Sequence, residues 1–217
     1  MCAKLINSFE FEQALWQSGI TRIAGVDEAG RGPLAGPVVA AAAILPSRWA
    51  EMGLPVELVG LNDSKLLTEA QRETYFEFLT RCAEIEFAIA AVEAGVIDRI
   101  NILQATHRAM NDALAQMNPL PPHALVDGKP VKTLRVPQTA IVKGDARSFS
   151  IAAASVLAKV TRDRLMREYH VKFPEYGFDE HKGYGTAKHL AAIKKHGACP
   201  IHRKSFAPLK PEDPKLF

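Results

Sequence analysis

Four acidic side chains stand beside sequence signals that would bring them together at one end of a sheet. Asp27 and Glu28 follow an apolar run, and Asp127 follows a second one. Asp163 lies inside a long helical pattern in the second half of the chain. Carboxylates at the ends of buried strands repel one another and are costly to desolvate unless cations neutralise them. The four acids therefore predict a divalent metal site, and such a site suggests phosphate chemistry.

Each acid also has a simpler explanation when it is taken alone. Asp127 is followed by glycine, and Asp-Gly is a common turn pair. Asp163 could form a surface ion pair with Arg167, one helical turn along. Strand geometry sends Asp27 and Glu28 to opposite faces, so they share one site only if the chain bends at Glu28. Only the four acids together favour two-metal hydrolysis of a phosphodiester.

The chemistry of the side chains also indicates which metal would bind. All four ligands would be oxygens, which favours Mg²⁺ or Mn²⁺ over zinc. The seven histidines form no motif such as HExxH, and the three cysteines contain no CxxC pair. A disulfide framework is therefore not expected, and a reducing cytoplasmic location fits.

Other motifs could contact a nucleic acid. The glycine loop at 30–32 allows close backbone approach, and its arginine could bind a phosphate. The tyrosine between two glycines could stack on a sugar or base. Each motif also has a structural alternative. The glycine loop could be a tight turn, the serines could cap helices, and the tyrosine could fill a local core. The candidate substrate-binding residues are Gly30, Arg31, Gly32, Ser64, Lys65, Lys143, Ser148, Ser150 and Tyr184.

The charge of the chain is strongly asymmetric. Residues 1–128 contain 9 basic and 16 acidic residues, whereas residues 129–217 contain 18 and 8. The second half thus carries a net charge of +10. This excess suggests a polyanionic partner, although a solvated basic surface would also explain it.

Strand and helix signals alternate, which predicts an α/β architecture with helices packed on a mixed sheet. No run is long enough to span a membrane, and no secretory signal precedes the first strand. The region from 49 to 63 reads as irregular. Strands are expected at 20–27, 38–45, 86–92, 123–127 and 139–143, with helices after Ser8 and Thr68 and at 97–117, 148–173 and 186–196.

The long helix at 148–173 has an apolar stripe that includes Val156 and Val160. Asp163 falls on this stripe, whereas Arg162 falls on the charged side. A carboxylate in such a position needs a partner. For the whole chain we expect an N-terminal helical extension at 1–19, a catalytic domain at 20–207 that includes a C-terminal helical part, and an extended tail at 208–217.

The motifs occur in the order found in a known family. The run GVDEAGRGPLAGPV at 25–38 closely resembles the opening block of ribonuclease HII. The resemblance extends over about residues 20 to 207. It includes Asn62-Asp63-Ser64-Lys65, Val126-Asp127-Gly128, Lys143-Gly144-Asp145, the helix from Ser150 to Asp163, and His181-Lys182-Gly183-Tyr184-Gly185-Thr186.

The resemblance implies a ribonuclease-H-like fold with a C-terminal helical extension. It also implies that Asp27, Glu28, Asp127 and Asp163 are the family's metal-binding acids. The loop at 30–32 would sense a ribose 2′-hydroxyl, and Tyr184 would stack at the RNA–DNA junction. The implied activity is cleavage of RNA in RNA–DNA hybrids, and cleavage on the 5′ side of single ribonucleotides in DNA. The products would carry 3′-hydroxyl and 5′-phosphate ends. Type HIII enzymes usually have lysine at the position of Arg31 and an added N-terminal domain, so type HII is the better match.

Two other functions remain as alternatives. One is a DNA nuclease of the same fold group, such as a resolvase, and the other is a non-catalytic module that binds hybrids. We expect a monomer whose partners are RNA–DNA hybrids and DNA that contains ribonucleotides, and no membrane. The final Lys215-Leu216-Phe217 could bind a sliding clamp.

Overall fold

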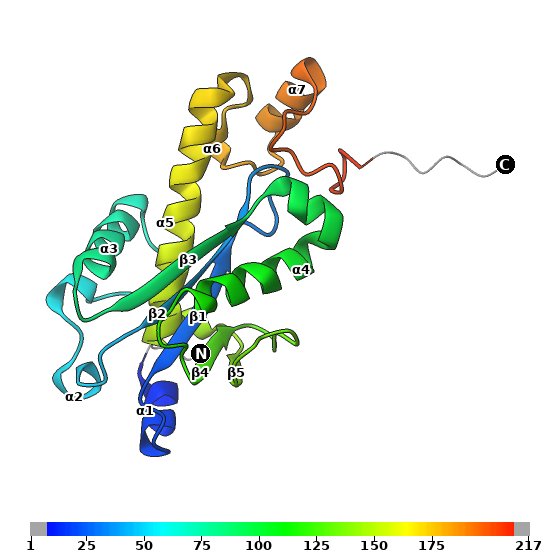
Figure 1. Cartoon of the computed structure of the whole chain (residues 1–217). Coiled ribbons are helices and arrows are strands. Elements are labelled where there is room, and N and C mark those ends of the chain that lie inside the picture. Colours follow the sequence, from blue (N-terminus) through cyan, green and yellow to red (C-terminus); the bar gives the residue numbers. More distant parts are fainter. Residues whose placement is uncertain (1–7, 211–217) are drawn as a thin grey trace, which may run out of the picture.

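A five-stranded mixed sheet forms the centre of the protein, and the structure, a computed structural model, describes residues 8–210 (Figure 1). The strand order is β3-β2-β1-β4-β5. β1 pairs antiparallel with β2 and parallel with β4. β2–β3 is antiparallel and β4–β5 is parallel. The strands are β1 (Ile23–Ala29), β2 (Val38–Ile44), β3 (Glu86–Val92), β4 (His123–Asp127) and β5 (Gln138–Ile141). The predicted α/β class is confirmed.

Helices cover both faces of this sheet. Alternate residues of β2 enter two different cores, one under α4 and the other under α3 and α5. Figure 1 shows α5 running along the sheet and continuing beyond it to α6 and α7. The helices are α1 (Glu10–Gln17), α2 (Trp49–Met52), α3 (Glu69–Arg81), α4 (Ala94–Ala115), α5 (Phe149–Lys172), α6 (Phe178–His181) and α7 (Ala187–His196), with 3₁₀ turns at Val56–Leu58, Gly144–Ala146 and Pro174–Tyr176.

The elements differ from the sequence predictions in several places, among them β5, which ends at Ile141 rather than at 143, and α6, which was not predicted. The region expected to be irregular contains α2 and a 3₁₀ turn. β1 begins three residues later than predicted and continues through Ala29. α4 begins at Ala94 and contains a break at Asn101, where φ is 64°. Most of the predicted tail lies outside the described residues.

The pairing of β1 with β4 brings two acids to the same edge of the sheet. Val26 pairs with Val126, and the next residues along these parallel strands are Asp27 and Asp127. Neighbouring strands lie about 4.8 Å apart, so the two carboxylates start from adjacent backbone positions.

Gly25 allows α5 to lie directly on β1. A Cβ atom at this position would be 2.1 Å from the carbonyl carbon of Ser150 and 2.3 Å from the nitrogen of Ile151. No side chain fits between a strand and a helix backbone at this distance. The close packing fixes the distance between α5 and the sheet. It therefore also fixes the position of the α5 residues that lie beyond the end of β1.

We predict that Gly25→Ala lowers the free energy of unfolding by about 3 kcal/mol or more, since the added methyl group must push two backbones apart. Urea denaturation would measure this change. Gly95→Ala is the matched control, because the nearest atom to its Cβ is the end of Arg99 at 3.9 Å. Equal stabilities for the two variants would contradict the account of this contact.

Candidate active site

Three of the four predicted acids line one cavity at the end of β1. The cavity has a volume of about 440 Å³, and Asp27, Glu28 and Asp127 contribute to its wall. Asp27 is 4% exposed and accepts a hydrogen bond of 2.7 Å from the backbone N–H of Glu28. Asp127 accepts a 2.7 Å hydrogen bond from the N–H of Gly144. Both carboxylates are therefore held in place by backbone donors.

The electrostatics of the cavity oppose a full set of negative charges. Burial, then the charges of Glu28 and Asp127, raise the pKa of Asp27 well above its usual range. Burial also raises the pKa of Glu28, against the opposing effect of Arg31. Two unit charges about 5 Å apart repel by roughly 3 kcal/mol at an effective dielectric constant of 20. These groups therefore hold protons more tightly than free carboxylates unless a cation replaces the protons.

Glu28 reaches the cavity in a different way from the one expected. A bend at Glu28, the condition given for a shared site, is not needed: β1 continues to Ala29, Glu28 pairs with Ala40 of β2, and both acids line the cavity. Glu28 instead points to the opposite face from Asp27, as strand geometry requires. Both residues still line the cavity, and Arg31 forms an ion pair of 3.1 Å with Glu28.

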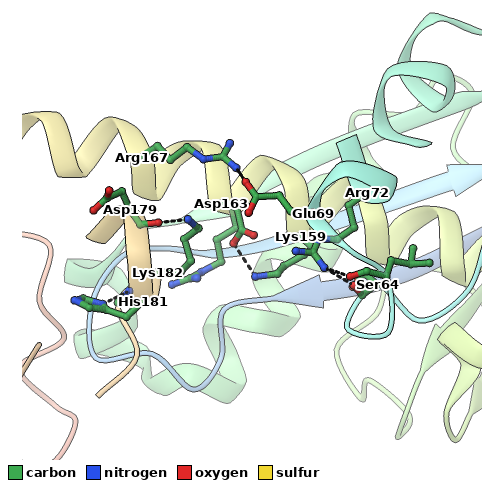
Figure 2. A network of polar contacts seen from close by, with 12 residues as sticks. Ser64, Glu69, Arg72, Lys159, Asp163, Arg167, Asp179, His181 and Lys182 are labelled. Carbon is green, nitrogen blue, oxygen red and sulfur yellow. Dashed lines mark hydrogen bonds and ion pairs between the residues drawn. The ribbon is translucent and has the colours of Figure 1, made fainter. Parts of the chain in front are cut away.

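The fourth acid, Asp163, is buried but faces a lysine. Its carboxylate lies 2.7 Å from the ammonium group of Lys159, one turn earlier on α5 (Figure 2). Lys159 lines the cavity and Asp163 does not. The alternative pairing with Arg167 is wrong, because Arg167 binds Glu69 and Glu73. In the described part of the chain, no three acidic, histidine or cysteine side chains are arranged to hold a metal ion as they stand.

Sequence reasoning missed a further acid beside the site. Asp145 is 5% exposed and lies with Lys65, Lys143 and Asp127 around an adjoining hollow. Burial and the charges of Asp127 and Asp63 raise the pKa of Asp145 to about 6. Burial lowers the pKa of Lys65, but the surrounding acids outweigh it and the net shift is upward. Asp145 was visible in the motif Lys143-Gly144-Asp145, but nothing in the sequence indicates that it is buried.

The loop before α3 contributes polar groups to the cavity. Ser64 and Lys65, both predicted to bind substrate, line it together with Arg72 and Ser155. The hydroxyl groups of Ser64 and Ser155 lie 2.9 Å apart. Arg72 fixes this loop by donating hydrogen bonds to the carbonyl groups of Ser64 and Leu67 (Figure 2). The ammonium group of Lys65 lies 3.7 Å from Asp145 and 3.8 Å from Asp63, on a largely exposed side chain.

Two of the predicted substrate contacts lie elsewhere. Ser148 is fully buried, donates a 2.6 Å hydrogen bond to Glu12 and caps α5 through the N–H of Ile151. Ser150 is 1% exposed and lies under β1 at Gly25. The start of α5 is thus packed inside the protein, and neither hydroxyl lines the cavity. Motif reasoning could not detect this, because the buried partner of Ser148 is 136 residues away in α1.

Two buried arginines hold the glycine loop at 30–37. Arg162 donates to the carbonyl groups of Pro37 and Ala35. Arg203 donates to the carbonyl groups of Gly36, Arg31 and Gly30, at 3.0, 2.9 and 2.6 Å. These carbonyl groups have no partner in a sheet, and only a guanidinium group supplies so many donors in one plane. The loop backbone is therefore fixed from the inside while its outer side faces the cavity.

The placement of Arg162 corrects an expectation. The helical pattern assigned it to the charged side of α5, but it is 1% exposed. Burial lowers the pKa of Arg162 to about 10, and burial with the charge of Arg162 lowers the pKa of Arg203 to about 9. Both groups remain charged at neutral pH. Gly30 is needed here, since its φ is +94° and a Cβ would lie 2.0 Å from the Nε of Arg162.

Tyr184 is held over the same loop by the C-terminal part of the chain. Its ring carbon Cε1 would lie 3.6 Å from a Cβ on Gly32, and 48% of the residue is exposed. The Nδ1 of His189 contacts the carbonyl of Tyr184 at 2.9 Å, and its Nε2 contacts the Nε2 of His202 at 3.0 Å. Burial lowers the pKa of both histidines, that of His202 to about 4. A pair of neutral imidazoles thus anchors the tyrosine backbone.

Comparison with known proteins decides the family. The family model described as ribonuclease HII matches residues 24–209. The ribonuclease HII of Bacillus cereus strain B4264 is 52% identical over 207 residues, which cover 95% of this chain and 77% of that protein. The ribonuclease HII of Bacillus thuringiensis strain Al Hakam is 51% identical with the same coverage.

This chain belongs to the ribonuclease HII family. It is therefore a ribonuclease, a hydrolase that acts on the RNA of RNA–DNA hybrids, and the expected family and enzyme class are confirmed. Among the described residues, no helix is long and apolar enough to cross a membrane.

Solved structures agree on the fold. Ribonuclease H2 from Pyrococcus horikoshii OT3 superposes with a TM-score of 0.71 and 29% identity, covering 87% of this chain and 95% of that chain. Ribonuclease HII from Archaeoglobus fulgidus, solved in complex with PCNA, has a TM-score of 0.70 and 22% identity, covering 90% and 98%. The predicted ribonuclease-H-like fold is thus confirmed.

We predict that Arg203→Lys loosens the glycine loop, because one ammonium group cannot bind three separated carbonyl groups. Backbone amides of residues 30–36 should exchange with solvent faster, and hybrid cleavage should fall about tenfold or more. Hydrogen exchange and a cleavage assay would measure both effects. The control is Arg167→Lys, at an exposed ion pair on α5. Unchanged exchange and cleavage in Arg203→Lys would contradict the role of this arginine.

Proposed function

We propose that the cavity at the end of β1 cuts the RNA strand of RNA–DNA hybrids and cuts DNA on the 5′ side of embedded ribonucleotides. The products would carry 3′-hydroxyl and 5′-phosphate ends. The observation that supports this proposal best is the group of three interacting carboxylates, with raised pKa values at Asp27 and Glu28, in a cavity that also contains basic side chains. Such a site suits a phosphodiester only when divalent cations bind there as well.

The donor chemistry fits Mg²⁺ or Mn²⁺, which prefer carboxylate oxygens. Asp27, Glu28 and Asp127 would bind these cations, and Asp163 would join them by turning away from Lys159. Two such ions supply an activated water and stabilise the leaving oxygen. A related structure, Bst-RNase HIII, was determined in complex with Mn²⁺. Which ion this protein uses, and whether it binds two, belong to the proposal.

The chain's own residues would position the substrate. Lys65 and Lys159 bring positive charge to the wall of the cavity, where the scissile phosphate would lie. Gly30, Arg31 and Gly32 would approach the ribose 2′-hydroxyl, with the loop held by the buried arginines. Tyr184 would stack beside Gly32 at the junction with DNA. Lys143 lies at the adjoining hollow and would contact a neighbouring phosphate. Ser148 and Ser150 are left out of this proposal, since both are buried in the core.

The remaining expectations concern partners and location. We expect a monomer that works in the cytoplasm. The Archaeoglobus protein is described in a complex with PCNA. Binding of a sliding clamp by Lys215-Leu216-Phe217 stays a prediction, as these residues lie outside the described part of the chain.

We predict that Asp127→Asn keeps the fold and hybrid binding but lowers cleavage at least about 100-fold. Asparagine retains the oxygen that accepts the N–H of Gly144, while the site loses one negative charge. A gel assay would compare an RNA–DNA hybrid, a duplex with one ribonucleotide and an all-DNA duplex, each with Mg²⁺, Mn²⁺ or chelator. Glu77→Gln, at an exposed position on α3, is the control.

Three results would overturn the proposal. Metal-dependent cleavage that survives in Asp127→Asn would remove the catalytic role of this edge of the sheet. Cutting of branched all-DNA duplex with no cutting of hybrids would favour the resolvase-like alternative. Binding of hybrids with no cleavage under any metal would favour a non-catalytic module.

A further inference from the structure

A second hollow opens from the cavity along α4, and the proposed mechanism does not use it. We call it the α4 groove. Its volume is about 720 Å³, and it is joined to the cavity through Glu28, Arg31 and Asp127, which line both. Leu103 and Met110 of α4 form one wall, and residues 128–133 form the other. Any duplex with its scissile phosphate at the acids would pass near this opening.

The charge of the α4 groove is positive away from the acids. Besides Glu28 and Asp127, the charged side chains that line it are Arg31, Lys129 and Lys132. Both lysines are exposed, and neither has an ion-pair partner among residues 8–210. Gln104, His107 and Thr133 also line a neighbouring hollow, whose charged residues are Arg135 and the ion pair of Arg108 with Asp112. Two lysines without ion-pair partners in a groove joined to a phosphodiester site suit a polyanion.

The loop that carries the two lysines is fixed in place. Gln138 of β5 binds both the N–H and the carbonyl of Val131, each at 2.8 Å. Asn111 of α4 binds the carbonyl of Thr133 and the N–H of Arg135. Val131 is 4% exposed and packs in the core. The buried Val131, between Lys129 and Lys132, thus anchors the loop. The backbone of the two lysines is therefore fixed, while their side chains are exposed to solvent.

We propose that the α4 groove binds the phosphodiester backbone of the substrate next to the scissile position, through Lys129 and Lys132. This inference rests on the proposed function. The groove wall from Leu103 to Met110 spans seven helical steps, about 10 Å at 1.5 Å per residue. One strand of a duplex advances about 3.4 Å per nucleotide, so the wall matches roughly three nucleotides. The exposed Leu103 would lie against sugar rings, and the lysines would lie against phosphates.

The test compares Lys129→Gln/Lys132→Gln with wild-type protein on a duplex that contains one ribonucleotide, from 50 to 300 mM NaCl with Mg²⁺. We expect kcat to be unchanged and KM to rise about tenfold at the middle of this range. Each lost phosphate contact should reduce the steepness of log(kcat/KM) against log[salt] by about 0.9. Lys129→Arg/Lys132→Arg should restore wild-type values, because the positive charges return.

The matched control removes two charges at the other end of the sheet. Arg48 and Arg81 are exposed on the segments that follow Ile44 of β2 and precede Glu86 of β3, which pair at the end of the sheet opposite the acids, and Arg48 forms an ion pair with Glu84. Arg48→Gln/Arg81→Gln should leave KM and the salt dependence unchanged. If this control loses as much affinity as the lysine variant, the effect is one of net charge and the groove assignment is wrong.

A second arm locates the contact on the substrate. Both proteins are assayed on duplexes trimmed to two base pairs on one side of the ribonucleotide or on the other. Wild-type protein should bind one of the two trimmed duplexes more weakly than the full-length duplex. The lysine variant, which already lacks this contact, should bind that trimmed duplex as well as it binds the full-length duplex. Equal losses for both proteins on both duplexes would overturn the groove assignment while leaving cleavage intact. No cleavage of any duplex by wild-type protein would instead overturn the proposed function.

Discussion

Repulsion between carboxylates at one edge of the sheet is the constraint on which the rest of the site depends. The parallel pairing of β1 and β4 sets Asp27 beside Asp127, and strand geometry adds Glu28 on the other face. In the metal-free protein the folded-state pKa of Asp27 lies above its unfolded value. The stabilisation associated with Asp27 is therefore fully present below the unfolded pKa and is lost as the pH rises through the folded pKa. A bound cation would offset the repulsion and burial of the ionised Asp27 carboxylate at neutral pH.

Positive charge is distributed around these acids in two different ways. Lys65, Lys159 and Arg31 contact acids directly or lie among them. Arg162 and Arg203 are buried and bind backbone carbonyl groups of the glycine loop. The basic excess of the second half of the chain thus lies only partly at the surface. Part of it is buried and holds the glycine loop, and the same C-terminal segment anchors Tyr184 through neutral histidines.

Local patterns in the sequence predicted the elements well, and long-range contacts explain where they failed. The apolar runs before Asp27 and Asp127 marked strand ends, but no local signal shows that these strands are neighbours. The spacing of four between Lys159 and Asp163 could have indicated their ion pair. Arg162 was assigned to a solvated face because its carbonyl partners are about 125 residues away. Ser148 and Ser150 suited a phosphate contact by type, but Glu12 and Gly25 bury both.

The most direct test of the central constraint is calorimetric titration of Mn²⁺ into the protein at pH 6 and at pH 8. Protons held by Asp27 and Glu28 must leave when the cation binds, so their raised pKa values make binding weaker at the lower pH. We expect the affinity to rise with pH, protons to be released on binding, and both effects to shrink in Asp27→Asn. An affinity that is independent of pH and undiminished in Asp27→Asn would show that this cluster of carboxylates is not the cation site.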